Sequence, residues 1–103
     1  MTAKGYWIGR IDVQDEIAYR AYIDANAKPF ARFGARFLVR GGAFEAVEGA
    51  ARSRNVVIEF PSIDAARACY HSPEYQAAKA LRDPVSIGDL VIIEGYAGPQ
   101  PGD

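Results

Sequence analysis

Residues 54–60, with the sequence RNVVIEF, decide the fold of this chain. Val56, Val57 and Ile58 follow one another, so the stretch is apolar at nearly every position. A run of this kind is typical of a central β-strand that is covered on both faces. Pro61 follows directly and ends the strand, because proline cannot donate a ladder hydrogen bond.

Two stretches on either side of this run predict further strands. Residues 5–13 (GYWIGRIDV) alternate, with Tyr6 and Ile8 on one face and Trp7 on the other. Gly9 inside this strand indicates a close backbone approach or a bulge. Residues 88–96 (GDLVIIEGY) predict the last strand.

The stretch before the central run is more irregular. Residues 35–48 (ARFLVRGGAFEAVE) predict one extended strand, which bends or bulges at Gly41 and Gly42. The polar residues 49–53 are then the hairpin loop that leads into residues 54–60.

A long helix is predicted between the first and second strands. Asp15 offers a side-chain acceptor to the free amides of a helix start, Pro29 kinks the helix late, and Gly34 ends it. The apolar stripe of this helix is predicted to contain Ile17, Ala18, Ala21, Tyr22 and Ala25, continued by Phe30 and Phe33.

A second helical region follows Pro61. Ser62 is the expected cap, and the helix ends at His71, since Ser72 precedes a proline and disfavours helical angles. Ser72 and Pro73 then begin a new helical piece that closes at Asp83 and Pro84.

The order strand, helix, strand, strand, helix, strand predicts an α+β domain of ferredoxin-like βαββαβ topology, with a four-stranded antiparallel sheet. The domain is expected over residues 1–97, with residues 98–103 as a flexible tail. No linker or internal repeat divides the chain of 103 residues.

This topology leaves one side of the sheet without helices, yet the strands carry apolar groups on both sides. Leaving about six such side chains in water would forgo on the order of 10 kcal/mol, as much as a small domain's whole stability. A homodimer that pairs the two open sheet faces, as a dimeric α+β barrel does, is therefore predicted. The alternative is a monomer that covers this face with its own bent second strand and tail.

Composition narrows the classes of partner. Twelve basic against thirteen acidic residues give a net charge of -1 without a basic stripe, which disfavours nucleic acid. Cys69 is the single cysteine, so no internal disulfide forms. No apolar run reaches membrane-spanning length and no leader is evident, so a cytoplasmic protein without membrane contact is the default expectation.

His71 is the one side chain whose ordinary pKa lies near neutrality. It is a candidate catalytic residue that would act as a general base or hydrogen-bond donor at the mouth of a pocket, with Ser72 and Tyr75 as polar partners. Alternatively, it complements the helix dipole at the end of its helix. Arg40, before two glycines, is a candidate to hold a carboxylate or enolate oxygen, or else it forms a rim ion pair with Glu45 or Glu59.

Four residues are candidates for ligand contact besides Ser72. Asn26 lies just before the Pro29 kink and either projects its amide into the cavity or satisfies the loosened turn. Trp7, Tyr22 and Phe30 either wall an aromatic-binding pocket or pack in the core. No metal or cofactor site is predicted, because one histidine and one buried, unreactive cysteine supply too few ligands.

Several stretches together resemble the bacterial family catalogued as domain of unknown function 1330, DUF1330. They are KGYWIGRIDV with Tyr19-Arg20-Ala21-Tyr22, RFLVRGG, VVIEFPS, the segment from Tyr70 to Tyr75, and DLVIIEGY. They occur in the expected order from about Lys4 to Tyr96. Cys69 stands where the family commonly has an aromatic residue, a change that alters local packing or pocket volume.

The family is similar to the dimeric α+β barrel superfamily. The resemblance implies a ferredoxin-like fold paired between two subunits. That superfamily includes cofactor-free monooxygenases of quinol-like aromatics, muconolactone-type isomerases and haem enzymes of the chlorite dismutase type, so the resemblance itself implies no single reaction.

The leading hypothesis is a homodimer that binds a small organic acid in a cleft between helices and sheet. A narrower version of this hypothesis specifies an aromatic acid. Proton transfer or cofactor-free oxidation there would use His71, Arg40 and Tyr75. The alternative is a non-catalytic ligand-sensing or interaction module. A structural protein without a small ligand is a third hypothesis that the sequence leaves open.

Overall fold

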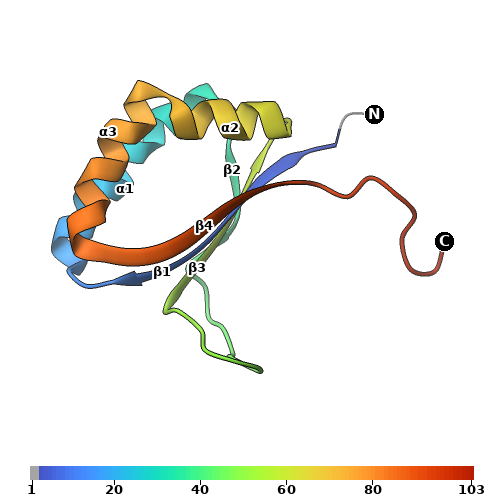
Figure 1. Ribbon diagram of the computed structural model, residues 1–103, viewed down its shortest axis with the longest axis horizontal. Coiled ribbons are helices and arrows are strands. Elements are labelled where there is room, and N and C mark those ends of the chain that lie inside the picture. The colour runs from blue at the N-terminus through green and yellow to red at the C-terminus, as the bar shows by residue number, and fades with distance from the viewer. Residues whose placement is uncertain (1–2) are drawn as a thin grey trace.

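The computed structural model describes residues 3–103, so the first two residues of the predicted domain lie outside it. Four strands form one sheet in the order β2-β3-β1-β4, and every neighbouring pair is antiparallel. The helices lie together on one face of this sheet, and the opposite face carries none (Figure 1). This is the predicted ferredoxin-like α+β fold.

The elements follow the predicted order. They are β1 (Gly5–Val13), α1 (Glu16–Arg32), β2 (Arg36–Arg40), β3 (Arg54–Phe60), α2 (Ile63–His71), α3 (Pro73–Arg82), the 3-10 turn η1 (Asp83–Val85) and β4 (Ser86–Glu94). Residues 95–103, which include the predicted tail, form no helix or strand. None of the described helices is both long and apolar enough to span a bilayer.

Side-chain caps set the helix starts as the sequence predicts. Asp15 accepts a hydrogen bond from Ala18 N at 3.0 Å, and Ser62 accepts one from Ala65 N at 3.1 Å. Gly34 adopts a φ of 76° after α1, in the left-handed region that glycine enters without strain. The helix layer therefore begins and ends where local chemistry dictates.

The predicted apolar stripe of α1 is partly wrong: Tyr22 and Phe30 are buried as predicted, but the stripe does not begin at Ile17. Ile17 is 90% exposed, whereas Tyr19 is buried. The buried residues Tyr19, Tyr22, Asn26 and Phe30 recur at spacings of three and four, and Pro29 is buried next to Phe30. Large aromatic rings bury more area than isoleucine or alanine, so the tyrosines turn toward the sheet.

The second strand is shorter than predicted. β2 ends at Arg40, and residues 41–53 form a loop that extends away from the sheet (Figure 1). The strand also has a β-bulge at Leu38. Phe37 pairs with Ile58 and Val39 pairs with the neighbouring residue, Val57, so Leu38 is one extra residue without a partner on β3. The chain does bend at Gly41, which has a φ of 67°, as predicted, but the ladder ends there and does not continue beyond it.

Rings from the helices and the sheet fill the core between them. The Trp7 ring lies 5.2 Å from that of Phe60 and 5.3 Å from that of Phe30, between centroids. The Trp7 indole N–H donates to Ala66 O at 2.9 Å. The indole N–H of Trp7 therefore has a hydrogen-bond partner inside the core, while its ring fills one end of the space between the helices and the sheet.

The opposite face of the sheet carries an apolar row across all four strands. Val39, Val57, Ile8 and Val91 lie side by side in the register, from β2 to β4. Ile8 is 39% and Val91 54% exposed, so neither the loop 41–53 nor the tail covers this row. The covered-monomer alternative therefore does not describe this chain.

Candidate functional site

A cavity of about 310 Å³ lies between α1, α3 and the sheet. Its walls are rings, including Trp7, Tyr22, Phe30, Phe37 and Tyr75. Four cationic side chains also line it, namely Arg40, Arg54, Lys79 and Arg82. The lining contains two carboxylates, Asp83 and Asp89. The volume is at the small end for ligand sites and suits a molecule of about one ring.

Gly9 leaves the floor of this cavity open. It pairs with Val56 on β3 and Leu90 on β4, and all three lie on the helix-covered face. A Cβ built at Gly9 would have only ordinary contacts, at 3.5 Å from the Ile11 and Leu90 methyl groups. The predicted close approach or bulge at Gly9 is therefore wrong, and the missing side chain leaves space instead.

The bulge at Leu38 aims Arg40 into the cavity. After the extra residue, Arg40 pairs with Val56, whose side chain lies under the helices. Without the bulge, Arg40 would pair with Asn55 and project from the opposite face, since side chains alternate along a strand. Its guanidinium lies 4.0 Å above the Phe37 ring. No ion pair with Glu45 or Glu59 forms among the described residues.

Arg54 is the second arginine at this end of the cavity. It pairs with Ile11 and lies two residues before Val56, on the same face of β3, and its guanidinium lies 5.8 Å from the centroid of the Tyr19 ring. A Cβ at Gly41 would approach Arg54 Nη1 to 2.8 Å, so a glycine there leaves room for the guanidinium. Arg54 Nε is buried without a hydrogen-bond partner among residues 3–103. Arg54 therefore has hydrogen-bonding capacity that the described protein does not use.

A shallower groove meets the cavity beside these arginines. Its lining includes Glu16 and Arg20 near the start of α1, and it shares Ile23, Arg40 and Arg54 with the cavity. The two arginines therefore border both the interior space and the surface.

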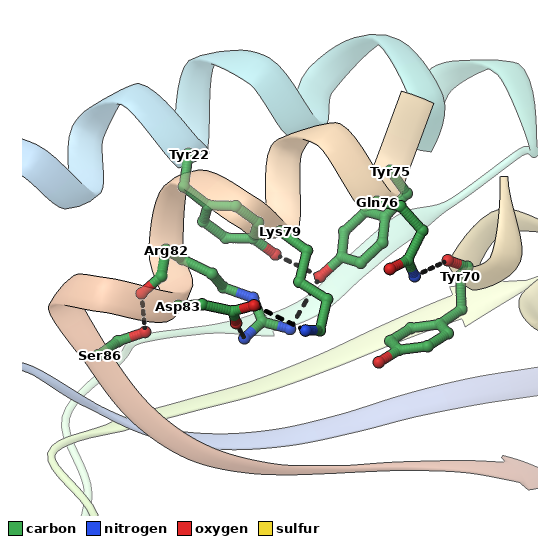
Figure 2. Close-up of polar contacts among 8 residues, drawn as sticks. All are labelled: Tyr22, Tyr70, Tyr75, Gln76, Lys79, Arg82, Asp83 and Ser86. Atoms are coloured by element: carbon green, nitrogen blue, oxygen red, sulfur yellow. Dashed lines mark hydrogen bonds and ion pairs between the residues drawn. The ribbon is translucent and has the colours of Figure 1, made fainter. Parts of the chain in front are cut away.

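Figure 2 shows the polar contacts of α3 that face the cavity. Tyr22 and Tyr75 place their hydroxyl oxygens 2.9 Å apart, and Arg82 Nη2 donates to the Tyr75 oxygen at 3.4 Å. Asp83 accepts from Lys79 at 2.7 Å and from Arg82 at 3.3 Å. Lys79 and Arg82 are thus partly neutralised, unlike Arg40 and Arg54.

Burial keeps the Tyr75 hydroxyl protonated. Desolvation and the neighbouring Tyr22 hold the pKa of Tyr75 far above its ordinary value. Tyr75 is therefore a hydrogen-bond donor at neutral pH and does not act as a base.

Asn26 is 4% exposed and lines the cavity one helical turn from Tyr22. Its amide forms no hydrogen bond with any other residue that the structure describes. Unlike Arg54 Nε, the Asn26 amide is not a fully buried group without a partner, so its polar atoms border the open cavity. The geometry agrees with the predicted projection into the cavity rather than with capture by the loosened turn.

His71 does not line the cavity, contrary to its expected place at the mouth. It is exposed at the end of α2, and its ring centroid lies 5.2 Å from that of Tyr70. The break before Pro73 turns the chain so that Tyr75 points inward and His71 outward. The structure therefore brings Tyr75 and Arg40 to one space and leaves His71 outside it.

Ser72 and Cys69 serve the backbone and the core. The Ser72 hydroxyl donates to Cys69 O at 2.7 Å and accepts from Tyr75 N at 3.2 Å, and Ser72 is absent from the cavity lining. Cys69 is fully buried, and burial raises the pKa of its thiol to about 12. The thiol is therefore an unreactive apolar group, as predicted.

Replacing Ser72 by alanine is expected to lower the free energy of unfolding by about 1–2 kcal/mol, because a buried helix cap is lost. The Ser62→Ala variant, whose partly buried hydroxyl makes only the capping bond, is the matched control and should lose about 0.5–1 kcal/mol. Urea unfolding measures both. Equal losses, or a ligand affinity that falls without a stability change, would contradict the structural role given to Ser72.

Arg54, Lys79 and Arg82 are cavity residues that the sequence analysis missed. A signal was present: Tyr75, Lys79 and Arg82 are spaced i, i+4 and i+7 and share one helix face. Arg54 had only its position at the start of an apolar strand. Within residues 3–103, no three His, Cys, Asp or Glu side chains cluster closely enough to hold a metal ion.

Comparison with known proteins identifies the family. The family described as Domain of unknown function (DUF1330) matches residues 4–96, nearly the whole chain. The chain belongs to the DUF1330 family. No curated protein matches this DUF1330 member.

Solved structures share its fold at low sequence identity. The RPA0582 protein of unknown function from Rhodopseudomonas palustris is 16% identical, with a TM-score of 0.74 over 95% of this chain and 86% of that one. SnoaB, a cofactor-independent oxygenase from Streptomyces nogalater, is 14% identical, with a TM-score of 0.63 over 99% and 100%. A dimeric ferredoxin-like protein of unknown function from Thermobifida fusca is 20% identical, with a TM-score of 0.62 over 91% and 92%.

Proposed function

We propose that this DUF1330 protein binds a small aromatic carboxylic acid in the cavity between its helices and its sheet. The observation that carries the proposal is the pair Arg40 and Arg54, which border an aromatic cavity and form no ion pair in the described structure. Guanidinium groups match a carboxylate in shape and charge, and a carboxylate would supply the counter-ion that both arginines lack in the described structure.

Two features of the cavity favour an aromatic ligand over an aliphatic one. The walls present rings, and Phe37 lies directly beneath the Arg40 guanidinium. Gly9 leaves the floor flat, so a planar ring has room between sheet and helices. A benzoate-sized acid would place its ring among Trp7, Phe30 and Tyr75 with its charge toward the surface.

The proposal is tested with 4-isopropylbenzoate and its uncharged match, 4-isopropylbenzamide. Arg54→Gln and Arg40→Gln should each weaken binding of the acid by about 10- to 100-fold, since each removes a charged hydrogen bond of about 1.5–3 kcal/mol. Binding of the amide should change by less than about threefold, because it has no charge for the arginines. Calorimetric titration measures both affinities.

Arg67→Gln is the matched control. Arg67 is exposed on α2, does not line the cavity, and should leave both affinities unchanged. Equal binding of acid and amide to the wild type would contradict the proposal, as would an effect of Arg67→Gln as large as that of Arg54→Gln.

A second candidate is cofactor-free oxidation of such an acid, the activity class named for SnoaB. What favours it is that guanidinium and hydroxyl donors face the cavity and stabilise an electron-rich phenolate. Oxygen uptake with 2,5-dihydroxybenzoate, above the rate without protein, would support it. Binding without uptake would favour the ligand-sensing alternative. His71, which points away, is assigned no part in the chemistry.

We also propose that the open sheet face pairs with a second copy of the chain. The row Val39, Val57, Ile8 and Val91 crosses the whole sheet and is continued by Ile93, which is 50% exposed. Solved relatives of this fold from Thermobifida fusca and Bacteroides fragilis are described as dimeric. A two-fold partner presents the same row and buries both.

A further inference from the structure

The cavity has a second polar region, formed by Tyr22 and Tyr75 together with Asn26. We infer that this region binds an acceptor oxygen of the ligand, so that the ligand is an aromatic acid with a keto or hydroxyl oxygen across the ring from its carboxylate. This inference rests on the proposed acid binding and adds the second functional group.

Counting protons in the tyrosine pair supports the inference. Two hydroxyl groups carry two protons, and the 2.9 Å contact between the oxygens uses only one. The other contact of the pair is the Arg82 guanidinium, which is itself a donor. Whichever tyrosine donates to its neighbour, one hydroxyl proton has no acceptor among residues 3–103.

Asn26 independently indicates a ligand at the same place. It follows Tyr22 by four residues on α1, so the two side chains lie on one helix face. The residue is 4% exposed and lines the cavity, and none of the hydrogen bonds found among residues 3–103 involves its amide. A free hydroxyl proton and a free amide thus lie on one helix face, and a carbonyl or hydroxyl oxygen can accept from both.

The two polar regions share one cavity. Arg40, Arg54, Tyr22 and Tyr75 all line the same space of about 310 Å³, which has room for a ligand of about one ring that carries both groups. Because burial raises the pKa of Tyr75, its hydroxyl remains protonated, and Arg82 beside it favours negative charge on the bound oxygen.

The test uses ligands that carry the two groups in every combination. The probes are the 3- and 4-acetylbenzoates, the 3- and 4-isopropylbenzoates as oxygen-free shape matches, and 3- and 4-methylacetophenone without a carboxylate. Calorimetric titration of wild type, Tyr75→Phe and Tyr22→Phe gives the affinities. Tyr96→Phe is the control, because its hydroxyl bonds to Pro99 O in the C-terminal segment.

We expect the wild type to prefer one acetylbenzoate isomer over its isopropyl match by about tenfold, the effect of one hydrogen bond to a buried site. Of Tyr75→Phe and Tyr22→Phe, the variant that lacks the hydroxyl donating to the ligand should remove this preference, and the other should retain it; both should change isopropylbenzoate affinity by less than about twofold. Tyr96→Phe should retain the preference.

Each failure has its own signature. Equal affinity for acetyl and isopropyl acids in the wild type, or a preference that survives in both phenylalanine variants, would overturn the tyrosine site and leave acid binding intact. Methylacetophenones that bind as tightly as the acetylbenzoates would overturn acid binding and support the tyrosine site. Absence of binding by all six probes would overturn both.

Discussion

Replacing Ile8 by lysine is expected to convert the protein from a dimer into a monomer at micromolar concentration. Ile8 lies in the middle of the apolar row, between Val57 on β3 and Val91 on β4. A charge buried there without a partner would raise the dimer dissociation constant by at least about 100-fold. Sedimentation equilibrium measures the constant for wild type and variant.

Ile17→Lys is the matched control for this substitution. Ile17 is 90% exposed on α1, on the other side of the sheet from the row, so the same chemical change should leave the dimer intact. A wild type that sediments as a monomer at these concentrations would contradict the proposed pairing. So would an Ile8→Lys variant that remains a dimer.

Replacing Gly9 by leucine is expected to abolish most ligand binding without unfolding the protein. The leucine side chain would rise from the cavity floor between Val56 and Leu90, where the ligand ring is proposed to lie. Forcing it into occupied space costs about 1–3 kcal/mol, which weakens binding by about 10- to 100-fold. Free protein should be no less stable, since a strand-interior glycine itself costs about 0.5–1 kcal/mol relative to alanine.

Two other glycine variants control for strand effects. Gly9→Ala adds only a Cβ at ordinary contact distance and should weaken binding much less than leucine does. Gly88→Ala places its Cβ 2.9 Å from Arg10 O, so it should lower the melting temperature. Thermal unfolding and titration with 4-isopropylbenzoate give both quantities. Undiminished binding by Gly9→Leu would show that the ligand lies elsewhere.

Local chemistry made most of the fold predictable. Asp15, Ser62 and the Ser72-Pro73 pair place three helix starts through side-chain acceptors that act within one turn. The run Val56-Val57-Ile58 predicted a central strand, and β3 lies between β2 and β1. These signals need no knowledge of distant contacts.

The site was less predictable because it depends on register and on contacts between distant segments. The bulge at Leu38 moves the Arg40 side chain to the other face of the sheet. The pattern of polar and apolar residues in the sequence does not indicate whether a bulge is present. On α1, Ile17 and Tyr19 fit competing stripes, and only the packing against the sheet selects Tyr19. His71 was singled out for its ordinary pKa, a property that says nothing of which way the chain turns at Pro73.

The most direct test of the central claim is a crystal structure of the protein soaked with 4-acetylbenzoate. Electron density for the ring is expected above Gly9, with the carboxylate within hydrogen-bond distance of both Arg40 and Arg54. An empty cavity at saturating ligand, or a carboxylate bound away from both guanidinium groups, would contradict the account.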